Sequence, residues 1–169
     1  MIDSAANPTG NGGTAAPAGP NFQGRVLAQY IKDLSFENPN VTKLLNGPGD
    51  NPNRKFQVDV RASALSADTF ESIIDFRAEI TSKIGIIFEL ELVYGGLFKL
   101  ENLPQDALEP FLLVNCPSLL FPFVRRIVAD VTSDGGFPPL LLDPIDFAGL
   151  YMQKKQKGEV TAIKPGKSS

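Results

Sequence analysis

Four segments of the chain alternate between apolar and polar residues, and this two-residue period constrains the fold more than any other feature. The clearest segment is 86–100, where apolar residues at even positions alternate with Glu89 and Glu91. Side chains of a strand point to opposite faces in turn, so such a run forms a strand with one buried and one solvated face. The other segments are 25–37, 55–65 and 69–80. Together they predict a half-buried antiparallel sheet of four strands.

The segment 117–133 predicts a helix with an unusually wide apolar stripe. On a helix of about 3.6 residues per turn, its Leu, Phe, Ile and Val side chains fill slightly more than half of the circumference. A helix that covers one sheet face needs a stripe of roughly 100°. We therefore expect this helix to pack against two surfaces, the second being a partner subunit or a client chain.

Two further helices are predicted on either side of the wide one. A short helix over 104–115 has Pro104 near its start. The glycine pair Gly135-Gly136 ends the wide helix, and an extended apolar connector leads to a last helix over 144–153. The sequence therefore predicts an α+β fold.

Two local irregularities are also predicted. Gly95-Gly96 lies inside a strand-like run, which is typical of a β-bulge. Pro122 removes a helical amide, so a kink or an irregular first part of the wide helix is expected.

The chain divides into one domain and two tails. Residues 1–21 are mostly Gly, Pro, Ala, Asn and Thr, a composition that predicts a disordered N-terminal tail. Residues 154–169 are rich in lysine and predict a flexible basic C-terminal tail. The domain between them, 22–153, contains a long Pro/Gly/Asn-rich linker at 38–54 that carries apolar residues, and such loops are more often functional than idle.

The composition argues against several classes of function. The chain has no histidine and one cysteine, Cys116, so it lacks the commonest general base and metal ligand. No phosphate-binding loop or dinucleotide fingerprint is present, and we predict neither an enzyme nor a cofactor or metal site. Residues 22–152 carry 11 basic and 17 acidic residues, which disfavours nucleic acid and favours basic partners.

Localisation follows from the absence of targeting features. No run of 18 or more apolar residues is present, so no transmembrane helix or direct membrane insertion is expected. The N-terminus lacks the basic and apolar regions of a secretory signal. One cysteine cannot form an internal disulfide, which fits a reducing cytoplasm. Cys116 itself is expected to be a small buried hydrophobe.

Three long segments resemble the SecB protein-export chaperones. They are KDLSFENP (32–39), YGGLFKLEN (94–102) and NCPSLLFPFVRRIVADVTSDGGFPPLLLDPIDFAGLY (115–151), and the spacing of the four strands between them fits as well. The resemblance implies helices on one face of the sheet and a homotetramer built as a dimer of dimers. It further implies a cytosolic, ATP-independent chaperone that holds secretory preproteins unfolded and delivers them to the translocase ATPase SecA.

The resemblance assigns a docking role to acidic residues on one sheet face. Their strand registers place Asp33, Glu37, Glu89 and Glu91 opposite the apolar face. Taken alone, exposed carboxylates indicate only a solvated face. The family implies SecA docking through residues matching Asp33, Glu37 and Glu91, whereas Glu89 stands where the family commonly has an apolar residue. Some family members also contact SecA through a C-terminal segment, and the lysine-rich tail here differs from that pattern.

The linker and the connector supply the candidates for a client-binding groove. From the residues alone, core packing is favoured for any one of them, but shallow apolar grooves beside mobile loops suit many extended sequences. The candidates are Val41, Leu44, Leu45, Phe98, Phe137, Leu140, Leu142 and Phe147. An alternative use of the same groove is to bind a lipid or another small apolar ligand.

A last set of residues concerns assembly. Leu90, Leu92 and Tyr94 fit the core of the sheet, and the resemblance implies that matching strand positions influence the oligomer interface. Whether they contact a partner directly is left open by the sequence.

Overall fold

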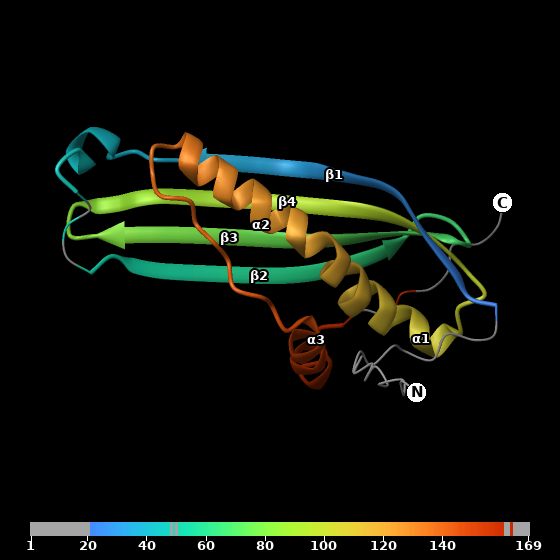
Figure 1. Cartoon of the computed structure of the whole chain (residues 1–169). Coiled ribbons are helices and arrows are strands. Elements are labelled where there is room, and N and C mark those ends of the chain that lie inside the picture. The colour runs from blue at the N-terminus through green and yellow to red at the C-terminus, as the bar shows by residue number, and fades with distance from the viewer. Residues whose placement is uncertain (1–20, 48, 50, 161–162, 164–169) are drawn as a thin grey trace, which may run out of the picture.

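The computed structural model describes residues 21–160, except 48 and 50, together with residue 163. Nearly all of the predicted N-terminal tail therefore lies outside the described residues. All four predicted strands are present, with bounds within a few residues of those expected: β1 (Gln23–Glu37), β2 (Asn53–Ala64), β3 (Thr69–Ser82) and β4 (Gly85–Glu101). They form one antiparallel sheet in the order β1-β4-β3-β2, with the helices on one face (Figure 1). The predicted α+β fold is confirmed.

The strand order explains the length of the linker at 38–54. β1 and β2 are consecutive in the chain but lie at opposite edges of the sheet. Neighbouring strands lie about 4.8 Å apart, so the connection must cross three spacings, or on the order of 14 Å. The linker makes this crossing at one end of the sheet, and part of it forms a short 3-10 helix, Val41–Leu44 (Figure 1).

The predicted bulge at Gly95-Gly96 is wrong, because β4 pairs there with both neighbours without a shift in register. The two glycines instead permit close approach from both faces of the sheet. A Cβ atom on Gly96 would lie 2.8 Å from Leu120 Cδ2 of the overlying helix, and one on Gly95 would lie 2.9 Å from the Tyr30 ring. Real Cβ atoms do not approach other atoms so closely, so a larger residue at either position would force its neighbour to move.

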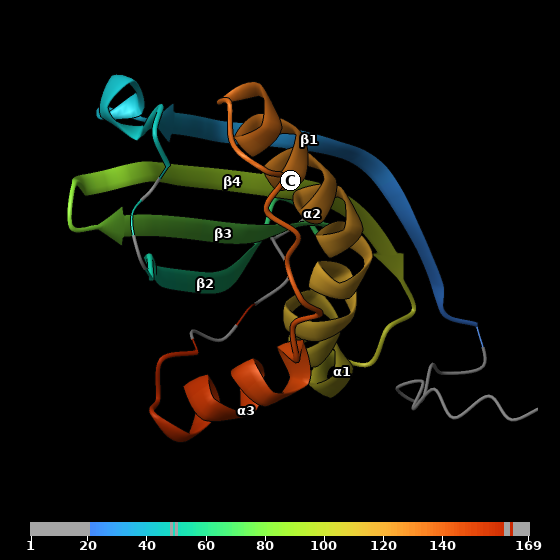
Figure 2. The same ribbon diagram turned by 60° about the vertical axis from the view of Figure 1, so that its left-hand side comes forward.

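Two β-bulges lie in the edge strand β1, and none lies at the glycine pair. Its pairing with β4 shifts once between Val26 and Ala28 and again between Ile31 and Asp33. Each shift leaves one extra residue on β1, and such bulges bend and twist a strand. β1 curves away from the rest of the sheet in Figure 2.

The helices follow the sheet in the predicted order. α1 (Gln105–Pro110), a π-helical turn (Phe111–Asn115) and α2 (Cys116–Asp134) form a continuous helical run. The π turn lies before α2 and not at Pro122, where an irregularity was expected; α2 continues as an α-helix through Pro122. The connector 137–146 crosses β3 and β2 to reach α3 (Phe147–Gln156) (Figure 1).

The last helix begins and ends three residues later than predicted. Asp146 sets its start, because its Oδ1 atom accepts a hydrogen bond of 2.9 Å from the Gly149 amide. α3 therefore extends into the segment that the sequence assigned to the flexible tail. Beyond it, Val160 is half-buried and Ile163 is buried, so this part of the tail packs against the domain.

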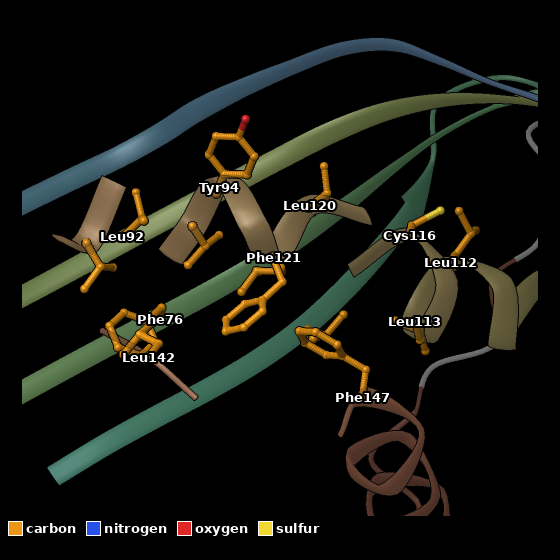
Figure 3. Close-up of a cluster of buried hydrophobic side chains, with 14 of the residues drawn as sticks. Phe76, Leu92, Tyr94, Leu112, Leu113, Cys116, Leu120, Phe121, Leu142 and Phe147 are labelled. Carbon is orange, nitrogen blue, oxygen red and sulfur yellow. The ribbon is translucent and has the colours of Figure 1, made fainter. Parts of the chain in front are cut away.

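The core lies between α2 and the two central strands. Leu92 of β4 and Leu120 of α2 are fully buried, and Phe121 packs edge-on against Phe147 of α3 at 5.7 Å (Figure 3). Cys116 is buried as expected, and this burial raises the pKa of its thiol far above its usual value. The opposite side of α2 remains open, with Leu119 53% and Phe123 39% exposed. The wide stripe thus covers the sheet and leaves a second apolar surface.

The run from Gln105 to Asp134 is long and apolar enough to cross a membrane, judged by length and composition alone. Core helices of soluble proteins meet the same criterion. The inner face of α2 packs on the sheet, as such a core helix does.

Candidate functional site

A groove runs between the connector and the edge strand β2 on the helix-covered side of the sheet. Its first part is a cavity of about 300 Å³ at the end of the sheet where β2 begins. Phe137 and Leu140 of the connector line one side, and Ile80, Phe88 and other sheet residues line the floor. Phe137 also packs against Phe88, with ring centroids 5.2 Å apart. The walls are therefore largely apolar and aromatic.

A second cavity, of about 290 Å³, continues the groove along β2. It is lined by Phe56 and Val58 of the strand and by connector residues 140–145. Arg54, Leu140 and Leu141 line both cavities, so the two are adjacent. Leu141 is 72% exposed and Phe56 is 45% exposed. The groove thus offers apolar side chains to solvent along an extended path.

The structure brings together only some of the predicted groove residues. Phe137 and Leu140 line the first cavity, and Leu142 lines the second. Phe98 and Phe147 are 2% and 3% exposed and belong to the core of a single chain.

The three apolar residues of the linker lie away from both cavities. Val41 and Leu45 are exposed at 40% and 81%, whereas Leu44 packs against the core. Within the described part of the linker, Val41 and Leu45 are thus the large apolar residues exposed to solvent.

Sequence reasoning missed the β2 wall of the groove and the exposed Leu141. Phe56 and Val58 lie on the apolar face of the segment 55–65, and the alternation predicts that this face is buried. Phe56 is exposed and Val58 only half-buried because the helices cover the central strands more completely than the β2 edge. Successive side chains of an extended chain point to opposite sides. Of the three consecutive leucines 140–142 in the extended connector, the middle one could therefore have been expected to face solvent.

Thr132 fixes the connector to α2. Its side chain is fully buried, and its hydroxyl donates to the Val128 carbonyl at 2.8 Å while accepting a hydrogen bond of 2.9 Å from the Leu140 amide. Its own carbonyl accepts a hydrogen bond of 3.1 Å from the Phe137 amide. Thr132 therefore positions Phe137 and Leu140 at the first cavity.

The acidic candidates lie together on the opposite, uncovered face of the sheet. Glu37 of β1 pairs with Glu89 of β4, which in turn pairs with Glu79 of β3, so three carboxylates form a row across the sheet. Asp33 lies opposite Val93, and Glu91 lies opposite Arg77 on the same face. This arrangement agrees with the predicted registers.

Basic residues on the same face modify its charge, and the sequence did not indicate their position. Arg77 Nη1 lies 3.4 Å from Glu91 Oε1, and both side chains are about half exposed. Lys55 pairs with Glu79 in the neighbouring strand. These side chains surround a cavity of about 150 Å³ together with Glu89. The face is therefore mixed, with the β1 and β4 side more acidic than the β2 side.

A polar cluster holds β1 to β3 across this face. The Tyr30 hydroxyl donates to Glu71 Oε1, and Lys32 Nζ lies 3.0 Å from the same oxygen. Burial and the neighbouring Glu71 raise the pKa of Tyr30 to about 12. Burial acts to raise the pKa of Glu71, but the hydrogen bonds from Tyr30 and Lys32 outweigh it and the pKa is lowered. Tyr30 therefore stays neutral and Glu71 charged at neutral pH.

The predicted interface residues Leu90, Leu92 and Tyr94 are buried within one chain. Tyr94 lies closest to an open surface, because its ring stacks on Phe123 and its hydroxyl donates to Gln29 at 3.2 Å. The exposed apolar residues beside it come from β1 and from the outer side of α2. They are Val26, Leu27, Ile31, Leu34, Leu119 and Phe123. Any role of Leu90 and Leu92 in assembly would be indirect, through support of this surface.

Among the residues that the structure describes, no group of three or more His, Cys, Asp or Glu side chains could hold a metal ion. The surfaces described above are a groove, a mixed-charge sheet face that is more acidic at β1 and β4, and a set of exposed apolar side chains. All three are suited to contacts with other polypeptides.

Comparison with known proteins gives a consistent result. The family model for SecB, preprotein translocase subunit SecB, matches residues 17–158. A protein-export protein SecB from Bradyrhizobium sp. (strain BTAi1 / ATCC BAA-1182) is 51% identical over 148 residues, covering 87% of this chain and 91% of that one. The protein-export protein SecB of Maricaulis maris (strain MCS10) is 45% identical over 169 residues, covering 100% of this chain and 94% of its own.

A solved structure shares the fold at low sequence identity. The SecB-like chaperone Rv1957 of Mycobacterium tuberculosis, in complex with a ChAD peptide from the HigA1 antitoxin, has a TM-score of 0.57 and 15% identity. The match covers 72% of this chain and 90% of that chain. With the family match over most of its length, the chain belongs to the SecB family of protein-export chaperones.

Proposed function

We propose that the protein is an ATP-independent cytoplasmic chaperone that holds secretory preproteins unfolded and delivers them to the SecA ATPase. Family membership supports the export role. The observation that carries the holding role is the open apolar groove between the connector and β2, where Leu141 and Phe56 face solvent. Extended chains present alternate side chains, which such a groove can accept without selecting one sequence.

The uncovered sheet face is the proposed SecA surface. Asp33, Glu37, Glu89 and Glu91 lie on it and away from the groove, so a client and SecA can bind at the same time. Complementary charge mainly affects encounter rate and orientation, since exposed pairs contribute little affinity. The ion pair with Arg77 offsets part of the negative charge of Glu91. We therefore expect Glu37 and Glu89 to contribute at least as much as Glu91 to SecA binding.

We further propose that the apolar surface of β1 and α2 forms contacts in a homotetramer. Its exposed side chains include Ile31, Leu34, Leu119 and Phe123. Exposed apolar side chains in such number are costly to leave in water and are typical of an assembly interface.

A small apolar ligand, the alternative occupant, fits the groove less well than an extended chain does. Ligand pockets usually enclose most of the ligand, whereas the walls here include largely exposed side chains such as Leu141. A lipid or detergent that displaced unfolded protein with defined stoichiometry would favour this alternative.

The test is suppression of aggregation. A reduced, unfolded secretory precursor is diluted from denaturant with and without the protein, and light scattering is followed with and without ATP. We expect the protein to suppress aggregation equally with and without ATP. The native form of the same precursor should not bind. Release driven by ATP, or equal binding of native protein, would contradict the proposed function.

A further inference from the structure

The outer edge of β2 is the free edge of the sheet on the groove side. β2 is the last strand in the order β1-β4-β3-β2, so its amides and carbonyls alternate between β3 and this edge. Val60 identifies which residues point outward, because its carbonyl accepts a hydrogen bond of 3.2 Å from Lys154 Nζ of α3. Since a strand residue directs its amide and carbonyl to the same edge, the Val60 amide points outward too.

The two-residue period extends this assignment along the strand. Arg54, Phe56 and Val58 share the parity of Val60, so they direct their backbone groups to the free edge. Their side chains line the second cavity of the groove. Among the described residues, no hydrogen bond from outside the sheet reaches the backbone of these three positions. This half of β2 therefore combines unpaired backbone groups with an adjacent apolar cavity.

The other half of the edge is closed. Asp59 Oδ1 accepts a hydrogen bond of 2.9 Å from the Val60 amide and also binds the Lys154 ammonium group. The side chain of Lys154 is only 22% exposed, whereas Lys155 and Lys157 are exposed. Past this point, Val160 and Ile163 of the C-terminal segment lie beside Ala62, around a cavity of about 200 Å³.

We propose that Lys154 closes the β2 edge at Val60 and so ends the stretch, from Arg54 to Val58, on which the backbone of an extended client pairs. A client strand added there would place alternate side chains in the groove, and it would stop where both Val60 groups are already bonded. Charged groups that block an edge are a known way to prevent unwanted strand pairing. The proposal rests on the proposed client binding and adds the position and the limit of the contact.

Hydrogen exchange with a synthetic peptide of alternating leucine and threonine tests the proposal. We expect the peptide to slow exchange of the amides of Arg54, Phe56 and Val58 in the unaltered protein, with no added protection at Val60 or Ala62. In Lys154→Met, which keeps the aliphatic stem but lacks the ammonium group, peptide-induced protection should extend to Val60. Lys157→Met is the matched control, because Lys157 is exposed and carries the same charge.

Two further readouts separate this inference from the proposed function. Without peptide, the Val60 amide should exchange faster in Lys154→Met than in Lys157→Met. A peptide methylated at alternate backbone nitrogens, with unchanged side chains, should bind about tenfold or more weakly, because each lost hydrogen bond contributes a modest net amount. Equal affinity of the two peptides would overturn backbone pairing, and an unchanged boundary in Lys154→Met would overturn the role of Lys154. If neither peptide nor unfolded precursor binds at all, the proposed function itself fails.

Discussion

Replacing Thr132 by valine tests the link between the core and the groove. Valine has nearly the same shape as threonine but has no hydroxyl, so the Leu140 amide loses its acceptor and the Val128 carbonyl loses a donor. Thr132 is fully buried and its hydrogen bond with the Leu140 amide is partly buried, so water has restricted access to the groups left unpaired. Leaving a buried amide unsatisfied costs about 1–3 kcal/mol, so we expect the free energy of unfolding to fall by about that amount.

The same change should affect client binding, because Thr132 positions Phe137 and Leu140 at the first cavity. Urea unfolding at fixed protein concentration measures stability, and hydrogen exchange at Leu140 reports the local change. Thr132→Ser is the control, since serine keeps the hydroxyl and loses one methyl group, at a cost of about 1 kcal/mol. If Thr132→Val unfolds at the same urea concentration as the unaltered protein and Leu140 exchanges no faster, the reasoning is refuted.

Three further predictions address the other surfaces. Glu91→Lys should weaken SecA binding about threefold to tenfold and reduce its salt dependence, because it reverses one exposed charge; binding measured at low and high salt checks this, and a fall in client binding with unchanged SecA affinity would reverse the assignment of the two faces. Phe123→Asp should lower the native mass in light scattering from that of a tetramer while circular dichroism stays unchanged, since the residue is 39% exposed in a single chain; a tetramer of unaltered stability would exclude the α2 surface. Gly96→Ala should lower the free energy of unfolding by about 1–3 kcal/mol because the new Cβ would meet Leu120 at 2.8 Å; an unchanged denaturation midpoint would show that Leu120 yields without cost.

The strands could be predicted from the sequence because their information is local. A two-residue period is complete within each segment, and even the solvated carboxylates of β1 and β4 were placed on the correct face. The limits of α3 were less accurate, since its start depends on the Asp146 side chain and its end extends into a lysine-rich segment. The glycine pair was misread for a similar reason, because the atoms that require it belong to Tyr30 and Leu120.

The groove could be predicted only in part, because it depends on strand order. The two-residue period places Phe56 and Val58 on the apolar face of a strand, but it does not show that β2 is an edge strand. The pairing of Glu91 with Arg77 likewise requires the register of β3 against β4. Phe98 was predicted in the groove because it is apolar and aromatic, whereas the structure buries it in the core.

The strand order also has a consequence for how the chain folds during synthesis. β1 is made first, yet its partner β4 is made last among the strands, and their paired residues are roughly 50 to 80 positions apart. At about 5–20 residues per second, β1 waits several seconds for its partner. During that interval its Val, Leu and Ile side chains have no sheet to cover them. Each new copy of the protein thus exposes, during its synthesis, a partly apolar segment of the kind that the proposed client groove would hold.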